Sequence, residues 1–388
     1  MRRERRERLT RSLRAADADG IVLLGPSNHE YVGVRRPCTD AMRVYYEPAV
    51  VAVTTGGEVH VWTPYPQGVP PDVAAERVHR EIDVEFEAGA RLLEDELIAV
   101  FGQRPRLAID EIPGGLADRL GPDARIAWID GAVVTQPARL RKTRDEIACL
   151  TRAQRINEEA ILDVRDALRP GVRQTELSAL FLRRAFEAGA TSSCVDPIWN
   201  LTPVDRAHQT PTLNGDVGFP VATNDRFLRE GDLILCDTGL VWEGYHSDYG
   251  ATWLCSDAPR PSPALHDCYR RYRDVMECVY ETLRPGCSAA DVTRAVMRLE
   301  PSFRLDHFYL AHGVGCDAAE SPFLGTDRRL EDDDEVEMVA GMTMVFEPIV
   351  WEDGVGGFRS EELVVVTETG CERLSAHDYA PFDEGPPR

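Results

Sequence analysis

The chain has 388 residues, of which 43% are hydrophobic and 28% are charged, and its formal net charge is −22 at pH 7. This length exceeds that of one average domain, and the mixed composition argues against a disordered chain, so we expect two domains. The negative charge would repel a phosphate backbone, which argues against nucleic acid as a partner. The ligand we expect is a small molecule.

A bilayer crossing requires about 20 consecutive apolar residues, and the sequence contains no such run. The start of the chain, residues 1–7, is mostly charged and lacks the apolar core of a secretion signal. The ten cysteines are scattered without a Cys-x-x-Cys pair, which is typical of reduced thiols. These features predict a cytoplasmic protein without membrane insertion.

Residues 1–140 alternate short apolar runs with amphipathic stretches, which predicts a small α/β domain. Residues 49–53 and 59–62 flank a turn at Thr55-Gly56-Gly57, a pattern that favours a hairpin. Further strands are expected at residues 21–24, 107–109 and 126–129, and a helix at residues 92–101.

The second domain is expected to span residues 141–388. It opens with apolar residues spaced by threes and fours from Ile147 to Leu168, which predicts one long helix.

This second domain contains an internal repeat. The segment Leu168-Arg169-Pro170-Gly171 recurs as Leu283-Arg284-Pro285-Gly286, in both cases between two expected helices. The apolar strand from Gly231 to Asp237 is echoed by the one from Gly341 to Glu347, and each then returns to a second acid, Asp248 or Glu361. Two half-domains related by a pseudo-twofold axis would place two carboxylates each at a shared centre.

Four carboxylates cannot lie together as anions, because neighbours about 4 Å apart would repel by several kcal/mol. Protons or metal cations must neutralise them, and divalent metal is the simpler solution at neutral pH. A two-residue turn at Trp242 and Glu243 would place Asp237 opposite Asp248 in a hairpin. The alternative is that these acids are solvated loop residues, and the repeat favours the metal hypothesis.

A histidine that could join the acids is His312, which lies between an apolar run and the glycines Gly313 and Gly315. Taken alone, such a histidine is more often structural than a ligand. Beside the repeated carboxylates, the ligand interpretation becomes the stronger one.

These residues resemble the motifs of the M24 metallopeptidase family, the pita-bread fold of methionine aminopeptidases, aminopeptidase P, prolidases and creatinase. The motifs that carry the resemblance are Cys236-Asp237-Thr238-Gly239 through Gly244-Tyr245-His246-Ser247-Asp248, His312-Gly313-Val314-Gly315, Glu347-Pro348 and Arg359-Ser360-Glu361. It covers about residues 145–375, and only size and position suggest the family's N-terminal companion domain for residues 1–140.

The resemblance implies a pair of divalent metal ions that activate a water molecule for attack. Its ligands would be Asp237, Asp248, His312, Glu347 and Glu361, and Glu347 would also transfer the water's proton. An oxygen-rich site with one imidazole favours manganese, with iron, cobalt or zinc as alternatives. The family's two-domain members also imply a homodimer.

The chain departs from the family pattern at two histidines that usually bind the substrate carbonyl or move protons. The corresponding neighbourhoods read Gly218-Phe219-Pro220-Val221-Ala222 and Ala318-Ala319-Glu320. This puts ordinary Xaa-Pro peptide hydrolysis in doubt.

Four residues are candidates for the missing roles. His246 and Arg359 each lie two residues before an acid and would share its face on an extended strand. His307 resembles a substrate-binding histidine of the aminopeptidase P branch, and His208 lies in a polar loop. For each histidine a surface role is the alternative, and Arg359 could orient Glu361 or capture a substrate carboxylate.

We therefore expect a metal-dependent hydrolase that cleaves a C–N bond in a small substrate, with an Xaa-Pro dipeptide as the default. One alternative is a non-peptidase enzyme on the same scaffold, such as a small-molecule hydrolase or a C–S lyase similar to dimethylsulfoniopropionate lyase. Another is a binding protein on an inactive scaffold, which the five intact ligand positions disfavour.

Overall fold

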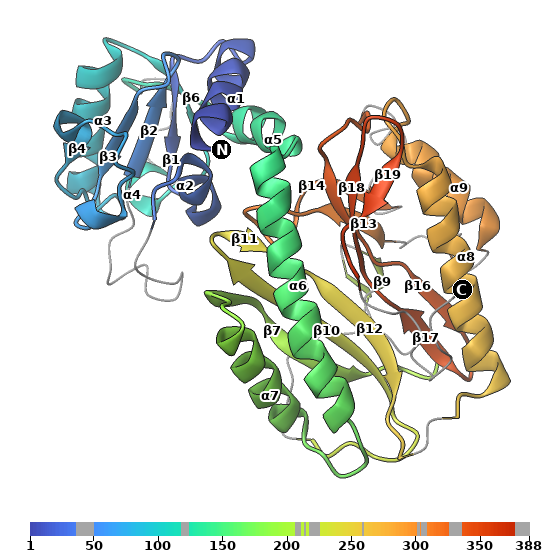
Figure 1. Cartoon of the computed structure of the whole chain (residues 1–388). Coiled ribbons are helices and arrows are strands. Elements are labelled where there is room, and N and C mark those ends of the chain that lie inside the picture. Colours follow the sequence, from blue (N-terminus) through green and yellow to red (C-terminus); the bar gives the residue numbers. More distant parts are fainter. Residues whose placement is uncertain are drawn as a thin grey trace. The chain divides into compact units, whose positions relative to one another are not determined.

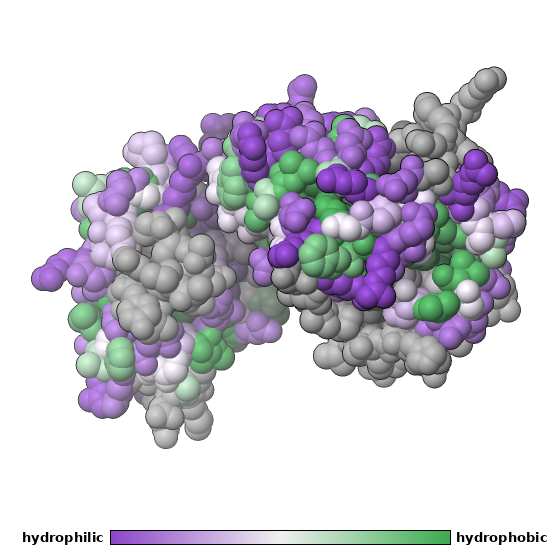
Figure 2. Space-filling model, turned by 90° about the horizontal axis from the view of Figure 1, so that it is seen from below, coloured by the Kyte–Doolittle hydropathy of each residue, from purple (hydrophilic) through white to green (hydrophobic). Residues whose placement is uncertain are grey.

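A computed structural model describes residues 1–35, 50–117, 124–205, 211–212, 215–216, 226–257, 260–300, 303, 309–325 and 336–376. The chain divides into two compact units, Met1–Thr143 and Arg144–Arg388. Within the described ranges, every helix is too short or too polar for a bilayer crossing. Figure 2 shows hydrophilic and hydrophobic residues interspersed over the visible face of the molecule.

The first unit is a mixed six-stranded sheet with helices (Figure 1). Its helices are α1 (Arg2–Ala15), α2 (Pro26–Val32), α3 (Glu87–Phe101), α4 (Gly114–Ala117) and α5 (Ala132–Leu140), with short 3-10 turns at Pro66–Gly68 and Ala75–Arg77. Its strands are β1 (Gly20–Leu23), β2 (Val50–Thr54), β3 (Val59–Trp62), β4 (Val78–His79), β5 (Arg106–Ile109) and β6 (Ala127–Asp130), in the order β4-β3-β2-β1-β5-β6.

The expected α/β character of this unit is confirmed. The hairpin forms as antiparallel β2 and β3, while β1, β5 and β6 run parallel. Parallel strands need a crossover connection, and α3 lies in the connection that leads to β5. The apolar face of α3, including Leu93 and Leu97, packs with Trp62 in the core of this unit.

The second unit is built from two similar halves. The first half contains α6 (Arg144–Ala167), α7 (Gln174–Glu187), β7 (Ser192–Leu201), β8 (Pro211–Thr212), β9 (Gly215–Asp216), β10 (Leu233–Trp242), β11 (Tyr245–His246) and β12 (Tyr249–Leu254). The second contains α8 (Pro263–Thr282), α9 (Ala289–Leu299), β13 (Tyr309–Gly313), β14 (Glu320–Gly325), β15 (Thr343–Phe346), β16 (Ile349–Glu352), β17 (Gly356–Arg359), β18 (Glu362–Val366) and β19 (Cys371–Arg373).

Both halves follow one plan, in which two helices precede an antiparallel sheet. The middle strand β10 pairs with β7 and β12, as β15 pairs with β13 and β18. The repeat extends to single hydrogen bonds, since the amide of Gly171 donates to Leu228 and that of Gly286 donates to Met338. The internal repeat expected from the sequence is thus present in the backbone.

The helices α6 and α7 lie against the sheet of the first half (Figure 1), and their apolar side chains share one core with it. Ile156 of α6 and Phe181 of α7 are buried there together with Trp199, whose ring stacks on that of Trp253 at 6.4 Å. This layer packs against β10, which contains Asp237, and β12, which begins directly after Asp248.

Candidate metal centre

Asp237 and Asp248 come from one hairpin. Asp237 lies within β10 and pairs with Gly250 of β12, and Asp248 lies just before β12. The turn falls at Glu243 and Gly244, because Trp242 pairs with Tyr245.

The prediction of a turn at Trp242 and Glu243, with Asp237 directly opposite Asp248, was therefore wrong by one residue. The φ angles of Glu243 and Gly244 are 50° and 81°, as hairpin turns of two residues require. Glycine adopts such an angle without steric cost, whereas tryptophan does not. The one-residue shift of the turn moves the partner of Asp237 by two residues, so both acids still face the same side.

Glu347 and Glu361 come from the second half. Glu347 directly follows β15, and its amide donates to the carbonyl of Leu310 at 3.0 Å. Glu361 lies between β17 and β18 and is fully buried, and its amide donates to the carbonyl of Gly250 at 3.0 Å. The hydrogen bond from Glu361 to Gly250 joins the segment between β17 and β18 to β12, the strand that pairs with β10 at Asp237.

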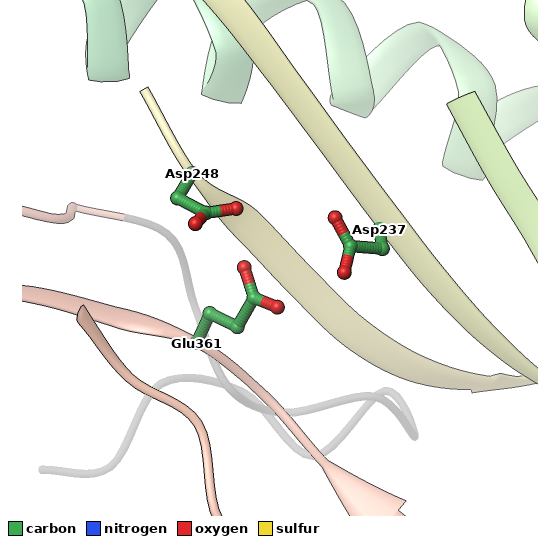
Figure 3. Close-up of side chains that lie close together, drawn as sticks. All are labelled: Asp237, Asp248 and Glu361. Carbon is green, nitrogen blue, oxygen red and sulfur yellow. The ribbon is translucent and has the colours of Figure 1, made fainter. Parts of the chain in front are cut away.

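The carboxylates of Asp237, Asp248 and Glu361 point toward one another (Figure 3). One oxygen from each lies within 4.8 Å of the others, and all three side chains are buried. Such a cluster of three buried carboxylates can hold a divalent cation.

His312 lies on β13 and faces the other pair of acids. Its Nδ1 lies 2.8 Å from the carbonyl of Gly313 and must carry the proton there, because a carbonyl only accepts. Its Nε2 lies 3.3 Å from Asp248 Oδ2 and 3.1 Å from Glu347 Oε1. A histidine whose Nδ1 donates to a carbonyl presents Nε2 in the orientation common among metal ligands.

Arg359 brings a fixed positive charge among the acids. It is 2% exposed, and its Nη2 donates to Asp237 Oδ2 at 3.0 Å and also to Glu347 and Glu361. This placement favours the expectation that Arg359 orients Glu361, and it extends the same contact to two further acids.

Burial of these charges changes their protonation. Burial raises the pKa of Asp237 to about 7, although Arg359 acts in the opposite direction. Burial also raises the pKa of Asp248. For His312, burial lowers the pKa, but hydrogen bonds to Asp248 and Glu347 outweigh it and raise the pKa to about 10.

The residues fit a cationic ligand. Burying an anionic oxygen without a partner is costly, and among the described residues Glu361 Oε2 has no hydrogen-bond partner. Among the described residues, the guanidinium of Arg359 and the imidazole of His312 face four acids, so these groups together carry excess negative charge. A divalent cation would satisfy both the buried oxygen and the charge.

Of the further histidines expected near the site, only His246 is described. It lies in β11, half-buried, and its Nδ1 is 3.2 Å from the carbonyl of Gly315, next to the His312 strand. His208 and His307 lie outside the described residues, as does the segment 218–222, where the resemblance implies that one histidine is missing. Ala319, at the place of the other missing histidine, is exposed.

Sequence reasoning missed several residues that support the acids, among them Gly250, Gln154 and Asn157. Gly250 leaves space for Glu361, and a Cβ there would lie 2.5 Å from Glu361 Cδ. Gln154 and Asn157 reach the hairpin from α6 and are fully buried. Two polar residues among the apolar positions of an otherwise amphipathic helix were the available signal.

The structure resembles solved structures of Xaa-Pro peptidases. It matches an Xaa-Pro dipeptidase from Bacillus anthracis with a TM-score of 0.76 and 21% sequence identity, covering 97% of this chain and 98% of that one. It matches the prolidase from Pyrococcus horikoshii OT3 with a TM-score of 0.75 and 18% identity, covering 97% and 99%. The fold is therefore the pita-bread fold of these proteins, preceded by an N-terminal α/β unit, as expected from the sequence.

Sequence comparison places the chain in a family of metallohydrolases. The model of metallopeptidase family M24 matches residues 148–368, more than half of the chain. The chain belongs to metallopeptidase family M24. It is also 24% identical over 245 residues to an Xaa-Pro dipeptidase of Pyrococcus furiosus, a match that covers 62% of this chain and 65% of that relative.

Proposed function

We propose that the second unit is a catalytic domain that binds two divalent metal ions and cleaves a C–N bond in a small substrate, with Xaa-Pro dipeptides as the first class to test. One observation carries this proposal: buried acids from both halves converge on one another and on His312. Burying that many acids lowers the stability of a protein, and a cation-dependent function accounts for it.

The proposed ligands form two overlapping groups. Asp237, Asp248 and Glu361 form the first, and His312, Asp248 and Glu347 form the second. When bound, the metal ions would supply a nucleophilic water at neutral pH and polarise the scissile carbonyl. Manganese suits the oxygen-rich set, with iron, cobalt and zinc as alternatives.

The remaining roles fall to residues around this centre. Glu347 would accept the proton of the attacking water and pass it to the leaving nitrogen. We keep His246 and His307 as candidates for proton transfer, and His208 for substrate binding. Arg359 was a candidate for substrate binding, but its contacts with three acids support an orienting role instead.

A second function on the same scaffold is favoured by one observation. Ala319 stands where the resemblance to the M24 peptidases implies a histidine at the substrate carbonyl. The alanine side chain is small and exposed. Without that imidazole the site has one fewer group to stabilise a tetrahedral intermediate. A non-peptidase reaction, either hydrolysis of another small amide or elimination at a C–S bond, would be less affected by the loss.

The two proposals are separated by a substrate panel. Protein loaded with Mn²⁺ would be assayed with Ala-Pro and Gly-Pro and with small amides, lactams and sulfonium compounds, using the Asp248→Ala variant as the blank. Turnover of a proline dipeptide that the variant lacks would support the peptidase. Turnover restricted to another panel member would overturn it in favour of the second function, and full activity of the variant would contradict the assigned site.

The N-terminal unit and assembly complete the proposal. We propose that residues 1–140 form the companion domain of the two-domain branch, that the protein acts as a homodimer, and that it is located in the cytoplasm. The size and position of this unit beside the family-matched region support the first of these. Light scattering on the purified protein tests the dimer, because a mass near 43.3 kDa would mean a monomer.

A further inference from the structure

The two returning acids occupy the same kind of position in their halves. Asp248 follows the pair His246-Ser247, and Glu361 follows the pair Arg359-Ser360. Both serines are buried, and both serine-acid segments lie between strands, one between β11 and β12 and the other between β17 and β18. Each segment has a backbone hydrogen bond to a neighbouring strand, from Ser247 to Leu240 and from Glu361 to Gly250, and side chains of the helices add further contacts.

In the first half, Asn157 of α6 supplies that support. Its Nδ2 donates to the carbonyl of Thr238 at 2.8 Å and to Ser247 Oγ at 3.1 Å. Its Oδ1 accepts from Thr238 Oγ1 at 2.9 Å. Thr238 follows Asp237 and Ser247 precedes Asp248, so one buried amide holds the chain beside both acids of this half.

Gln154, one turn earlier on α6, adds a direct contact. Its Oε1 accepts from the amide of Asp248 at 3.2 Å. Hydrogen bonds thus fix the hairpin to α6 both at Asp248 and at Ser247, the residue before it.

In the second half, Tyr272 of α8 holds the corresponding segment. Its hydroxyl donates to the carbonyl of Ser360 at 2.6 Å, and both residues are buried. The hydroxyl of Ser360 in turn donates to the carbonyl of Gly250 at 3.0 Å. Tyr272 therefore fixes Ser360, the residue before Glu361. Through Ser360 it also contacts β12 at Gly250, the residue opposite Asp237.

Asn157 and Tyr272 occupy equivalent positions in the internal repeat. Each lies 11 residues before the leucine of its Leu-Arg-Pro-Gly segment, at Leu168 and Leu283 respectively. The two side chains differ in chemistry, yet each reaches from the helix of its own half to the serine that precedes the returning acid.

We propose that Asn157 and Tyr272 are equivalent positioning residues that set the geometry of Asp248 and Glu361, and through it the affinity of the centre for metal. This inference rests on the metal centre of the proposed function. Neither residue is proposed as a ligand or as a group that touches substrate. Residues that orient metal ligands in this way typically change metal affinity by about 10–100-fold when replaced.

The test measures Mn²⁺ binding rather than turnover. Tyr272→Phe removes only the hydroxyl, and Asn157→Leu replaces the amide by an apolar group of similar size. The matched control for the first is Tyr31→Phe, because the Tyr31 hydroxyl also donates to a buried carbonyl, that of Ala138 at 2.7 Å, in the other unit. The control for the second is Ile156→Ala, a buried neighbour on α6.

We expect Tyr272→Phe and Asn157→Leu each to weaken Mn²⁺ binding in calorimetry by about tenfold or more and to change the EPR spectrum of bound Mn²⁺. The two controls should lose stability but keep the wild-type affinity and spectrum. If Asn157→Leu does not fold, Tyr272→Phe decides alone. Wild-type affinity and spectrum in folded Tyr272→Phe would overturn the inference while leaving the metal centre intact, whereas a wild-type protein that binds no Mn²⁺ would overturn both.

Discussion

Gly250 lies opposite Asp237 in the pairing of β10 with β12, and the space that a side chain at Gly250 would fill is occupied by Glu361. A Cβ there would lie 2.5 Å from Glu361 Cδ and 2.6 Å from Oε1. Glycine is therefore required for close approach, since it lets an acid of the second half reach an acid of the first.

Replacing Gly250 by alanine should displace the Glu361 carboxylate. We expect Gly250→Ala to weaken Mn²⁺ binding by about tenfold or more, because overpacking moves the side chain that must give way. Isothermal calorimetry would measure the change. Gly370→Ala is the control, because a Cβ there would contact nothing within 4 Å. Equal affinities in the two variants would argue against this role for Gly250.

Removing the charge of Arg359 should lower the unfolding free energy of the protein, and bound Mn²⁺ should restore part of this loss. Arg359→Met leaves buried carboxylates without their fixed cation, so we expect the metal-free protein to lose about 3–5 kcal/mol of unfolding free energy. Excess Mn²⁺ should reduce this deficit, since a divalent cation neutralises the same acids. Urea unfolding with and without Mn²⁺ would measure it.

Arg271→Met provides the comparison for that experiment. Arg271 of α8 pairs with Glu300, which follows α9, and with Glu352 of β16, and neither acid belongs to the proposed centre. The unfolding free energy that Arg271→Met loses should be the same with and without Mn²⁺. The account of Arg359 would be untenable if its own deficit were likewise independent of the metal.

Metal binding itself should stabilise the folded chain. At a free Mn²⁺ concentration of 100 times Kd, the expected gain is about 2.7 kcal/mol, which appears as a rise in Tm. Asp248→Ala removes an acid shared by both proposed ligand groups and should abolish the rise, while its circular dichroism spectrum stays that of the wild type. A full Mn²⁺-dependent rise in that variant would show that the metal binds elsewhere.

Restoring the missing histidine should reveal which reaction the site supports. Ala319 is exposed, so Ala319→His adds an imidazole at a position that is not part of the buried core. If the enzyme is a peptidase, an added group at the substrate carbonyl should raise kcat/KM for Ala-Pro by about tenfold. Steady-state kinetics with Ala319→Gln as a non-titrating control would measure the gain. No increase, in a variant that retains its metal, would favour the non-peptidase function.

Local patterns predicted many of the elements correctly. The β2–β3 hairpin, the parallel strands β5 and β6 and the long helix α6 all lie close to their expected residues. These predictions succeeded because alternation and helical spacing depend on residues near one another in the chain. The turn after Trp242 was misplaced by one residue because the permitted φ angles, rather than the spacing of the acids, decide where a hairpin reverses.

The repeat of Leu-Arg-Pro-Gly and of strands that end in acids was already visible in the sequence, and it implied two similar halves and a shared acidic centre. Whether those acids could approach one another depended on pairing between distant segments, such as Arg359 with Asp237, 122 residues apart. The tertiary structure also determined the placement of Arg359, the space at Gly250 and the support from Asn157 and Tyr272. Such contacts depend on side-chain direction and close packing, which no short pattern of residues encodes.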